Sequence, residues 1–382
     1  MAYKHRINWV DGMKINKDHF IGFEDAMMQQ MMQMNRRFVN QNNYGLLPHT
    51  KSNEDAVKLS ISIDGMDTLS VVIHKCFAVT LGGLHIEIDD RIQDAQEISE
   101  RINIREFIKN DTSQIGYVLL AANPFQRVAI GEVNSGEEPY RRPYVLQGYE
   151  MTLVSEKDLN TNDTGLNNIV VAKVLQDGDS VNLVDDYIPP CTSIQGHSEL
   201  KQTYIDVDVY LNKMEWYGLQ IILKIQQKNQ TNELSQIVLS IAKEVLYYLR
   251  STMSSFRNMD KYAPPIDMIT KVMSLARIIK GGIDLSIGSG KENLLNYISD
   301  WCDVSQVTFE NVIDNMVNLE YCHYDSAQAI EKVSEFTLLT HSLFKKLNEL
   351  EYIGKKSDSS IFVKEDVIIK EPEKKRRRFF ME

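Results

Sequence analysis

The chain has 382 residues, of which 43% are hydrophobic and 25% are charged. This balance allows a buried core, and the length is typical of two or three domains. The formal net charge is −11, and binding to nucleic-acid phosphates needs a basic face, so we expect no nucleic-acid partner.

Cysteine usage and hydropathy indicate a protein that is made and kept in the cytoplasm. The four cysteines are far apart and lack the close pairing of a zinc site, so we expect reduced thiols and no bound metal. The first residues lack the apolar segment of a secretory signal. No apolar run approaches the roughly 20 residues that span a bilayer.

The first segment is predicted to form a short extended arm followed by a helix over about residues 18–38. Its apolar positions recur near helical spacing, which predicts one apolar face. Two interpretations stay open: the face packs on its own domain, or it also contacts another subunit, for which adaptable methionines are well suited. The face consists of Phe20, Phe23, Met27, Met31 and Met34.

From about Ala56 the apolar period changes from that of a helix to that of a strand. Leu69, Val71 and Ile73 stand at every second position, and Gly82-Gly83 marks a turn before the next alternating run. Further strands are predicted at residues 115–122, 144–154 and 169–175. Short strands between turn signals, with few helical runs among them, predict an antiparallel β-sandwich or barrel.

Pro189-Pro190 closes the β region, and helical periodicity follows. Helices are predicted at residues 199–227, 233–256, 265–280, 292–300, 305–318 and 326–351, with Asp325 as the N-cap of the last. Short loops between them favour an antiparallel bundle. The fold class is therefore α+β and multidomain. We expect a sandwich domain over residues 1–193, a helical bundle over 194–353 and a short C-terminal arm over 354–382.

The C-terminal arm ends in a basic and aromatic cluster that could dock on an acidic partner or on an anionic membrane surface. A solvated tail is the alternative, because chain termini are commonly mobile and nearby acidic residues offset the charge. The cluster consists of Lys374, Lys375, Arg376, Arg377, Arg378, Phe379 and Phe380.

No motif predicts an active site. Gly288-Ser289-Gly290-Lys291 resembles part of a phosphate-binding loop, but the required earlier glycine is replaced by Leu285 and no Ser or Thr follows the lysine. Cys322 and His323 are sequence neighbours and therefore point in different directions. His19 lacks a ligand partner at metal spacing, so a hydrogen-bonding role is expected. We expect no enzyme activity and no cofactor.

Several short landmarks follow one another along the chain. Trp9 is followed by Asp11-Gly12-Met13, and His19-Phe20 begins the first helix. Tyr44-Gly45-Leu46 lies in the following turn and Gly83-Leu84 in a hairpin. Later come Tyr187-Ile188-Pro189-Pro190 at the end of the β region and Tyr321-Cys322-His323-Tyr324-Asp325 before a late helix. In this order, the landmarks resemble the TssK family, the trimeric baseplate adaptors of bacterial type VI secretion systems.

The resemblance implies a β shell like the shoulder of phage receptor-binding proteins, followed by a helical bundle. It implies a homotrimer at the cytoplasmic face of the cell membrane that binds wedge proteins like TssF and TssG and a membrane-complex component. Trp9, Gly12, Met13, His19 and Phe20 would lie in the shell. Together with Met27, Met31 and the basic cluster they are the expected partner-binding residues.

The chain departs from the family pattern after the bundle. Family members carry a full C-terminal head, whereas about thirty residues follow Ile353 here, so the basic cluster is expected to make the membrane-complex contact. Two alternatives to the adaptor are a phage-like baseplate or receptor-binding protein and an enzyme of unrecognised type.

Overall fold

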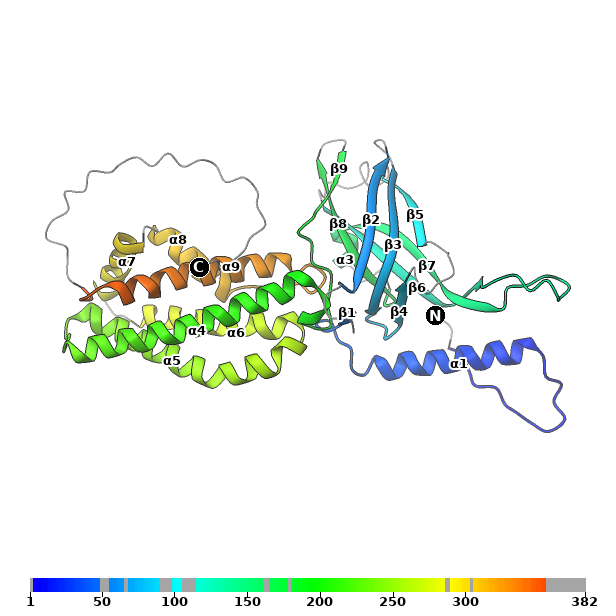
Figure 1. The fold of residues 1–382 in the computed structure, drawn as a ribbon, viewed down its shortest axis with the longest axis horizontal. Coiled ribbons are helices and arrows are strands. Elements are labelled where there is room, and N and C mark those ends of the chain that lie inside the picture. Colours follow the sequence, from blue (N-terminus) through cyan, green and yellow to red (C-terminus); the bar gives the residue numbers. More distant parts are fainter. Residues whose placement is uncertain are drawn as a thin grey trace. The chain divides into compact units, whose positions relative to one another are not determined.

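The computed structural model describes residues 3–48, 55–64, 68–89, 98–104, 115–160, 165–177, 180–285, 289–302 and 305–354. These form two compact units (Figure 1). Unit 1 comprises Met1–Lys201 together with two short segments, Tyr262–Ile266 and Cys322–Ala327. Unit 2 comprises Gln202–Lys261, Asp267–Tyr321 and Gln328–Glu382. Residues 355–382 of the expected C-terminal arm, with its basic cluster, lie outside the described residues.

Unit 1 contains helix α1 and two antiparallel sheets, so the expected fold class for this half is confirmed. In the first sheet, β3 pairs with β1, β2, β4 and β5; in the second, the strand order is β7-β6-β8-β9. The elements are α1 (Lys17–Asn35), β1 (Gly45–Leu46), β2 (Val57–Asp64), β3 (Thr68–Val79), β4 (His85–Asp89), β5 (Ile98–Asn103), β6 (Ile115–Ile130), β7 (Tyr144–Ser155), α3 (Glu156–Asn160), β8 (Asn168–Asp177), β9 (Ser180–Leu183) and η1 (Ile194–Gly196).

Strand β3 shows why the alternating pattern forms a sheet here. Leu69, Val71 and Ile73 are all buried, as the two-residue period of a half-buried strand predicts. The chain then turns through Gly82-Gly83, and β4 pairs antiparallel with β3. This hairpin was predicted from the same residues.

The two sheets of unit 1 are joined by hydrogen bonds from β7. The backbone N–H of Met151 donates to Glu100 of β5 at 2.6 Å, and the side-chain amide of Gln147 donates to the carbonyl of His85 on β4 at 3.1 Å. Tyr117 and Leu119 of β6 are among the buried residues of an apolar cluster in this unit. A sandwich-like arrangement results.

Strand β6 is longer than the sequence predicted. The expected strand ended at residue 122, but β6 continues to Ile130, and β7 pairs with it as far as Tyr144. The pairing of β6 with β7 has a register shift between Asn123 and Arg127. Since β8 pairs only up to Ala121, the outer part of this hairpin is a two-stranded ribbon.

The short segment Cys322–Ala327 returns to unit 1 and is held there by buried polar contacts. Oδ2 of Asp325 accepts hydrogen bonds from Lys173 Nζ at 2.5 Å and from the Tyr117 hydroxyl at 3.1 Å. The Tyr187 hydroxyl donates to the carbonyl of Tyr324 at 2.5 Å. The predicted N-cap role of Asp325 is therefore wrong, because its carboxylate is engaged by side chains of the sheet.

Unit 2 is built of helices, as predicted. They are α4 (Ser198–Gln227, which begins in unit 1), α5 (Glu233–Asn258), α6 (Pro265–Asp284), α7 (Ser289–Cys302), α8 (Gln306–Val317) and α9 (Ala327–Glu349), with η2 (Asp260–Tyr262) before α6. The predicted ends agree within a few residues. N-caps at Asn232 and Ser305 begin α5 and α8, because each side chain accepts a hydrogen bond from a backbone N–H of the first turn.

Buried aromatic residues fill the core of unit 2. Tyr210, Phe256 and Phe336 are fully buried. The Tyr210 hydroxyl lies 2.7 Å from Thr340 Oγ1 and joins α4 to α9. Lys224 of α4 donates to the carbonyls of Leu347 and Leu350, which satisfies acceptor groups at the end of α9. Within the described residues, no helix is long and apolar enough to span a membrane.

Candidate protein-interaction surfaces

The N-terminal arm exposes large apolar side chains. Trp9, Val10 and Ile15 are all exposed, and the Trp9 ring lies 6.2 Å from the ring of His19. Gly12 has a φ of +76°, the left-handed conformation that favours glycine. Met13, a predicted site residue, is half-buried, and its N–H donates to the carbonyl of Val10 at 3.3 Å.

Helix α1 begins with a reciprocal capping box. Oδ1 of Asn16 accepts hydrogen bonds from the N–H groups of Asp18 and His19. In return, Nδ1 of His19 accepts from the N–H of Asn16 at 3.2 Å. Such an exchange satisfies donors that a helix otherwise leaves unpaired at its start. His19 therefore has the hydrogen-bonding role that we expected.

Contacts on one side of α1 fix its rotation on unit 1. Lys4 Nζ lies 2.9 Å from Asp25, which is buried together with Ala26. Glu24 accepts from Arg127 of β6 at 2.7 Å. At the other end of the helix, Asn35 donates to the carbonyl of Gly83 at 3.0 Å. The remaining face of the helix consequently points in a defined direction.

That remaining face carries the apolar residues predicted from the sequence, and they are exposed. Met31 is 57% exposed and Met34 is 62% exposed. Burying such side chains is favourable, and a large contiguous apolar patch on a folded unit commonly marks an interaction site. We call this set the α1 stripe; it comprises Phe20, Phe23, Met27, Met31 and Met34.

Lys291 and the Cys322-His323 pair lie in structural surroundings. Lys291 forms ion pairs with Asp284 and Glu310, so it has two carboxylate partners. His323 Nε2 lies 2.8 Å from the carbonyl oxygen of Tyr44, and burial lowers its pKa to about 4. Burial also raises the pKa of Cys322, which disfavours the nucleophilic thiolate.

The part of the chain that the structure describes contains no group of three or more His, Cys, Asp or Glu side chains placed to hold a metal ion. A small cavity in unit 2 is lined by aliphatic and aromatic side chains, among them Ile241, Ile279 and Phe344. This lining offers no acid, base or nucleophile.

A second exposed apolar face, on α4, was not identified from the sequence. The sequence predicted the helix, but it did not predict that apolar residues would line the outer surface of the helix. Trp216 is 54% exposed and Ile205 is 53% exposed. We call the outer row the α4 seam; it comprises Ile205, Val209, Asn212, Trp216, Leu219 and Leu223.

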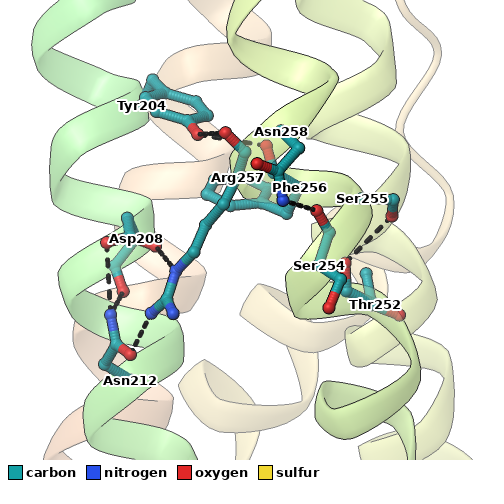
Figure 2. A network of polar contacts seen from close by, with 9 residues as sticks. All are labelled: Tyr204, Asp208, Asn212, Thr252, Ser254, Ser255, Phe256, Arg257 and Asn258. Carbon is teal, nitrogen blue, oxygen red and sulfur yellow. Dashed lines mark hydrogen bonds and ion pairs between the residues drawn. The ribbon is translucent and has the colours of Figure 1, made fainter.

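Polar contacts beside the α4 seam connect it to the end of α5 (Figure 2). Arg257 Nε donates to Asp208 at 2.9 Å, and its guanidinium also bonds Asn212. The Tyr204 hydroxyl donates to the carbonyl of Phe256 at 3.0 Å, and the two rings stack with centroids 4.7 Å apart. These contacts hold the outer surface of α4 in a defined geometry.

No family model matches the sequence, and no curated protein matches it. A crystal structure of TssK matches with a TM-score of 0.49 and 14% identity, covering 89% of this chain and 69% of that chain. TssK from T6SS EAEC in complex with a nanobody matches with a TM-score of 0.46 and 12% identity, covering 86% and 69%.

A further match is a chain of the type VI secretion TssK-TssF-TssG baseplate subcomplex. Its TM-score is 0.42 and its identity is 11%, covering 88% of this chain and 99% of that chain. At these identities and scores the matches do not assign the chain to a family.

Proposed function

We propose that this chain is a non-enzymatic structural subunit of a baseplate in a type VI secretion, or contractile injection, system. In this role it is a homotrimeric adaptor that links the baseplate wedge to the membrane-anchored complex from the cytoplasmic side. The observation that carries the proposal is the exposed α1 stripe, a fixed apolar face that no part of the described chain covers.

The α1 stripe and the neighbouring arm form the surface for wedge proteins like TssF and TssG. Buried aromatic and methionine side chains are enriched at the centre of protein interfaces, and the stripe offers both. Trp9, Phe20 and Met31 are exposed large residues of the kind that act as anchors in such contacts. The first of the sequence landmarks that resemble the TssK family, from Trp9 to Phe20, falls on the same arm and helix.

The basic cluster at residues 374–380 is proposed to contact the membrane complex. The cluster contains five consecutive basic residues, whereas the chain as a whole has a net charge of −11. It therefore offers a local positive charge to an acidic partner. Truncation after Gly354 should abolish recruitment of the chain by the membrane complex and leave wedge binding intact. Unchanged recruitment would refute this part of the proposal.

The wedge contact is tested with two matched substitutions on α1. Met31→Glu places a charge in the stripe, whereas Gln33→Glu places the same charge on an exposed position outside it. We expect Met31→Glu to weaken wedge binding by at least roughly tenfold, because the charge must be desolvated, and Gln33→Glu to change it less than about twofold. Calorimetric titration with purified wedge proteins measures both; equal effects would contradict the assignment.

A further inference from the structure

The end of α9 is tied to the rest of unit 2 by side-chain hydrogen bonds. A helix leaves its last four carbonyl groups without intrahelical partners, and helix ends commonly fray. Lys224 Nζ donates to the carbonyls of Leu347 and Leu350 at 3.4 Å and 2.7 Å. It also donates to the carbonyl of Asn348, so one ammonium group covers acceptors at and just beyond the helix end. Hydrogen bonds from a charged donor are stronger than neutral ones.

The residues that follow α9 are held in the same way. Lys228 Nζ lies 2.9 Å from a carboxylate oxygen of Glu351 and 4.4 Å from the ring centroid of Tyr352. The N–H of Ile353 donates to Gln230 Oε1 at 3.0 Å, and the Ile353 side chain is fully buried. The chain is therefore still packed on unit 2 after the helix has ended.

Contacts at the start of α5 and with α7 secure the last described residues. Asn232 Nδ2 donates to the carbonyl of Ile353 at 3.0 Å, and the N–H of Gly354 donates to the Tyr297 hydroxyl of α7 at 3.2 Å. The Asn232 side chain cannot easily move away, because its Oδ1 accepts a hydrogen bond from the N–H of Ser235 as the N-cap of α5. One side-chain amide thus caps α5 and holds the chain where it leaves the unit.

Together these side chains form a set that we call the exit clasp: Lys224, Lys228, Gln230, Asn232 and Tyr297. Four of them come from residues 224–232, where α4 ends and α5 begins, and the fifth belongs to α7. Water alone can satisfy the carbonyls at a helix end, so capping of α9 does not by itself require the clasp. A pull on the chain beyond Gly354 must break these bonds and expose Ile353 before it can peel α9 from the unit.

We propose that the exit clasp is a mechanical anchor for the segment that follows it. Tension on the residues beyond Gly354 passes to α4, α5 and α7, and α9 stays in place. This inference rests on the proposed contact between the basic cluster and the membrane complex, because that contact would put the connecting chain under tension. An unclasped helix end would be among the regions of the unit that open most easily.

A force-clamp experiment on the full-length protein tests the anchor. One handle is attached to the C-terminus, and the other to an introduced azide-bearing residue at the exposed position of Tyr247 on α5. Peeling residues 327–353 from the unit releases at most about 90 Å of extended chain, which identifies the event. Forced opening is governed by the rate of unfolding, so the peeling rate at constant force is the quantity to compare.

Two lysines near the end of α9 provide matched variants. Lys224→Gln removes a donor of the clasp, whereas Lys346→Gln breaks an exposed pair with Glu349 on α9 itself. We expect Lys224→Gln to raise the peeling rate at least roughly tenfold, because bonds from a charged donor are lost, and Lys346→Gln to change it less than about twofold. Equal peeling rates for Lys224→Gln and the wild type would overturn the proposal.

The variant Asn232→Asp tests the chain exit while it preserves the start of α5. Aspartate keeps an oxygen that caps α5, but it lacks the Nδ2 donor and places a carboxylate beside the carbonyl of Ile353. The peeling rate should rise in this variant too, while hydrogen exchange in the first turns of α5 stays within about twofold of the wild type. An unchanged peeling rate would contradict the anchor.

The outcomes separate this inference from the proposed function, because the pulling experiment needs no partner. A wild type that peels as fast as Lys224→Gln would refute the anchor and leave the membrane contact standing. Recruitment that survives truncation after Gly354 would refute the membrane contact, and with it the tension that the anchor is proposed to resist. Slow peeling that Lys224→Gln and Asn232→Asp accelerate, together with recruitment lost on truncation, would support both.

Discussion

Lys173 Nζ lies 2.5 Å from Oδ2 of Asp325, although 152 residues separate them in the sequence. Both side chains are buried, with exposures of 10% and 4%. The Tyr117 hydroxyl donates to the same oxygen, and burial, followed by the Asp325 charge, raises the pKa of Tyr117 well above its ordinary value. The hydroxyl therefore stays protonated and remains a donor.

Loss of one partner should be costly, because a buried charge would be left without its counter-ion. We expect Lys173→Met to lower the free energy of unfolding of unit 1 by about 3–5 kcal/mol. Hydrogen exchange of β6 and β8 under native conditions reports on this unit directly. Glu24→Gln, which breaks a more exposed pair with Arg127 in the same unit, should cost under about 1 kcal/mol.

A second test of this pair is the double variant Lys173→Met with Asp325→Leu. Replacing both partners of a buried pair by apolar residues is often neutral, so most of the loss should be recovered. Additive losses in the double variant would mean that the two residues act independently.

His323 should make the stability of unit 1 depend on pH. Burial lowers its pKa to about 4, although the hydrogen bond with the Tyr44 carbonyl opposes this shift. In the unfolded chain the imidazole of His323 binds a proton near pH 6.5. The stability that His323 contributes to the folded unit is therefore complete above pH 6.5 and is lost as pH falls toward 4.

Between pH 7 and pH 5 the His323 contribution should fall by about 2 kcal/mol. Urea unfolding at both pH values, compared between the wild type and His323→Gln, isolates this residue from the other titrating groups. The variant should be less stable at pH 7 and should lose less stability on acidification. Identical pH slopes in the two proteins would contradict this assignment.

Features determined by neighbours in the sequence could be predicted. Leu69 and Val71 are buried because the alternation of a strand places both on the same face. The helices of unit 2 follow from periodicity and from local caps such as Asn232 and Ser305, which act within a few residues. The α1 stripe was likewise visible as a spacing pattern.

Features that depend on distant residues could not be predicted. Whether the α1 stripe is covered depends on contacts such as the one between Glu24 and Arg127, 103 residues apart. Asp325 precedes a helix and looks like a cap, but the lysine that binds it lies on a distant strand. Helix α4 is apolar on two sides, and periodicity alone does not say which side faces the core.

The turn at Gly83 should be sensitive to any side chain. Its φ is +82°, and a Cβ there would lie 2.3 Å from the carbonyl oxygen of Met32 and 2.7 Å from the backbone nitrogen of Arg36. Gly12 provides a matched control, because its φ is +76° but a Cβ there would meet nothing within 4 Å.

Both Gly→Ala variants carry the cost of a positive φ, roughly 1 kcal/mol, but only Gly83→Ala also pushes the end of α1 away. We therefore expect faster hydrogen exchange in residues 27–36 for Gly83→Ala than for Gly12→Ala. Equal exchange in the two variants would show that α1 does not depend on this close approach.

The ion pair between Lys271 and Asp260 should contribute far more to unit 2 than the pair between Arg257 and Asp208. Asp260 is buried, and Lys271 Nζ contacts both of its carboxylate oxygens. Burial raises the pKa of Asp260 despite the lysine, which shows how costly its desolvation is. Arg257 and Asp208 have side-chain exposures of 46% and 33%, so water screens their attraction.

Lys271→Met should therefore lower the free energy of unfolding of unit 2 by about 3 kcal/mol at pH 7, whereas Arg257→Met should lower it by under about 1 kcal/mol. The Lys271→Met deficit should shrink as pH falls, because the unpaired Asp260 can bind a proton in the folded state and lose its buried charge. Urea unfolding at pH 7 and pH 5 measures both effects. A deficit that grows on acidification would mean that desolvation of Asp260 is not its cause.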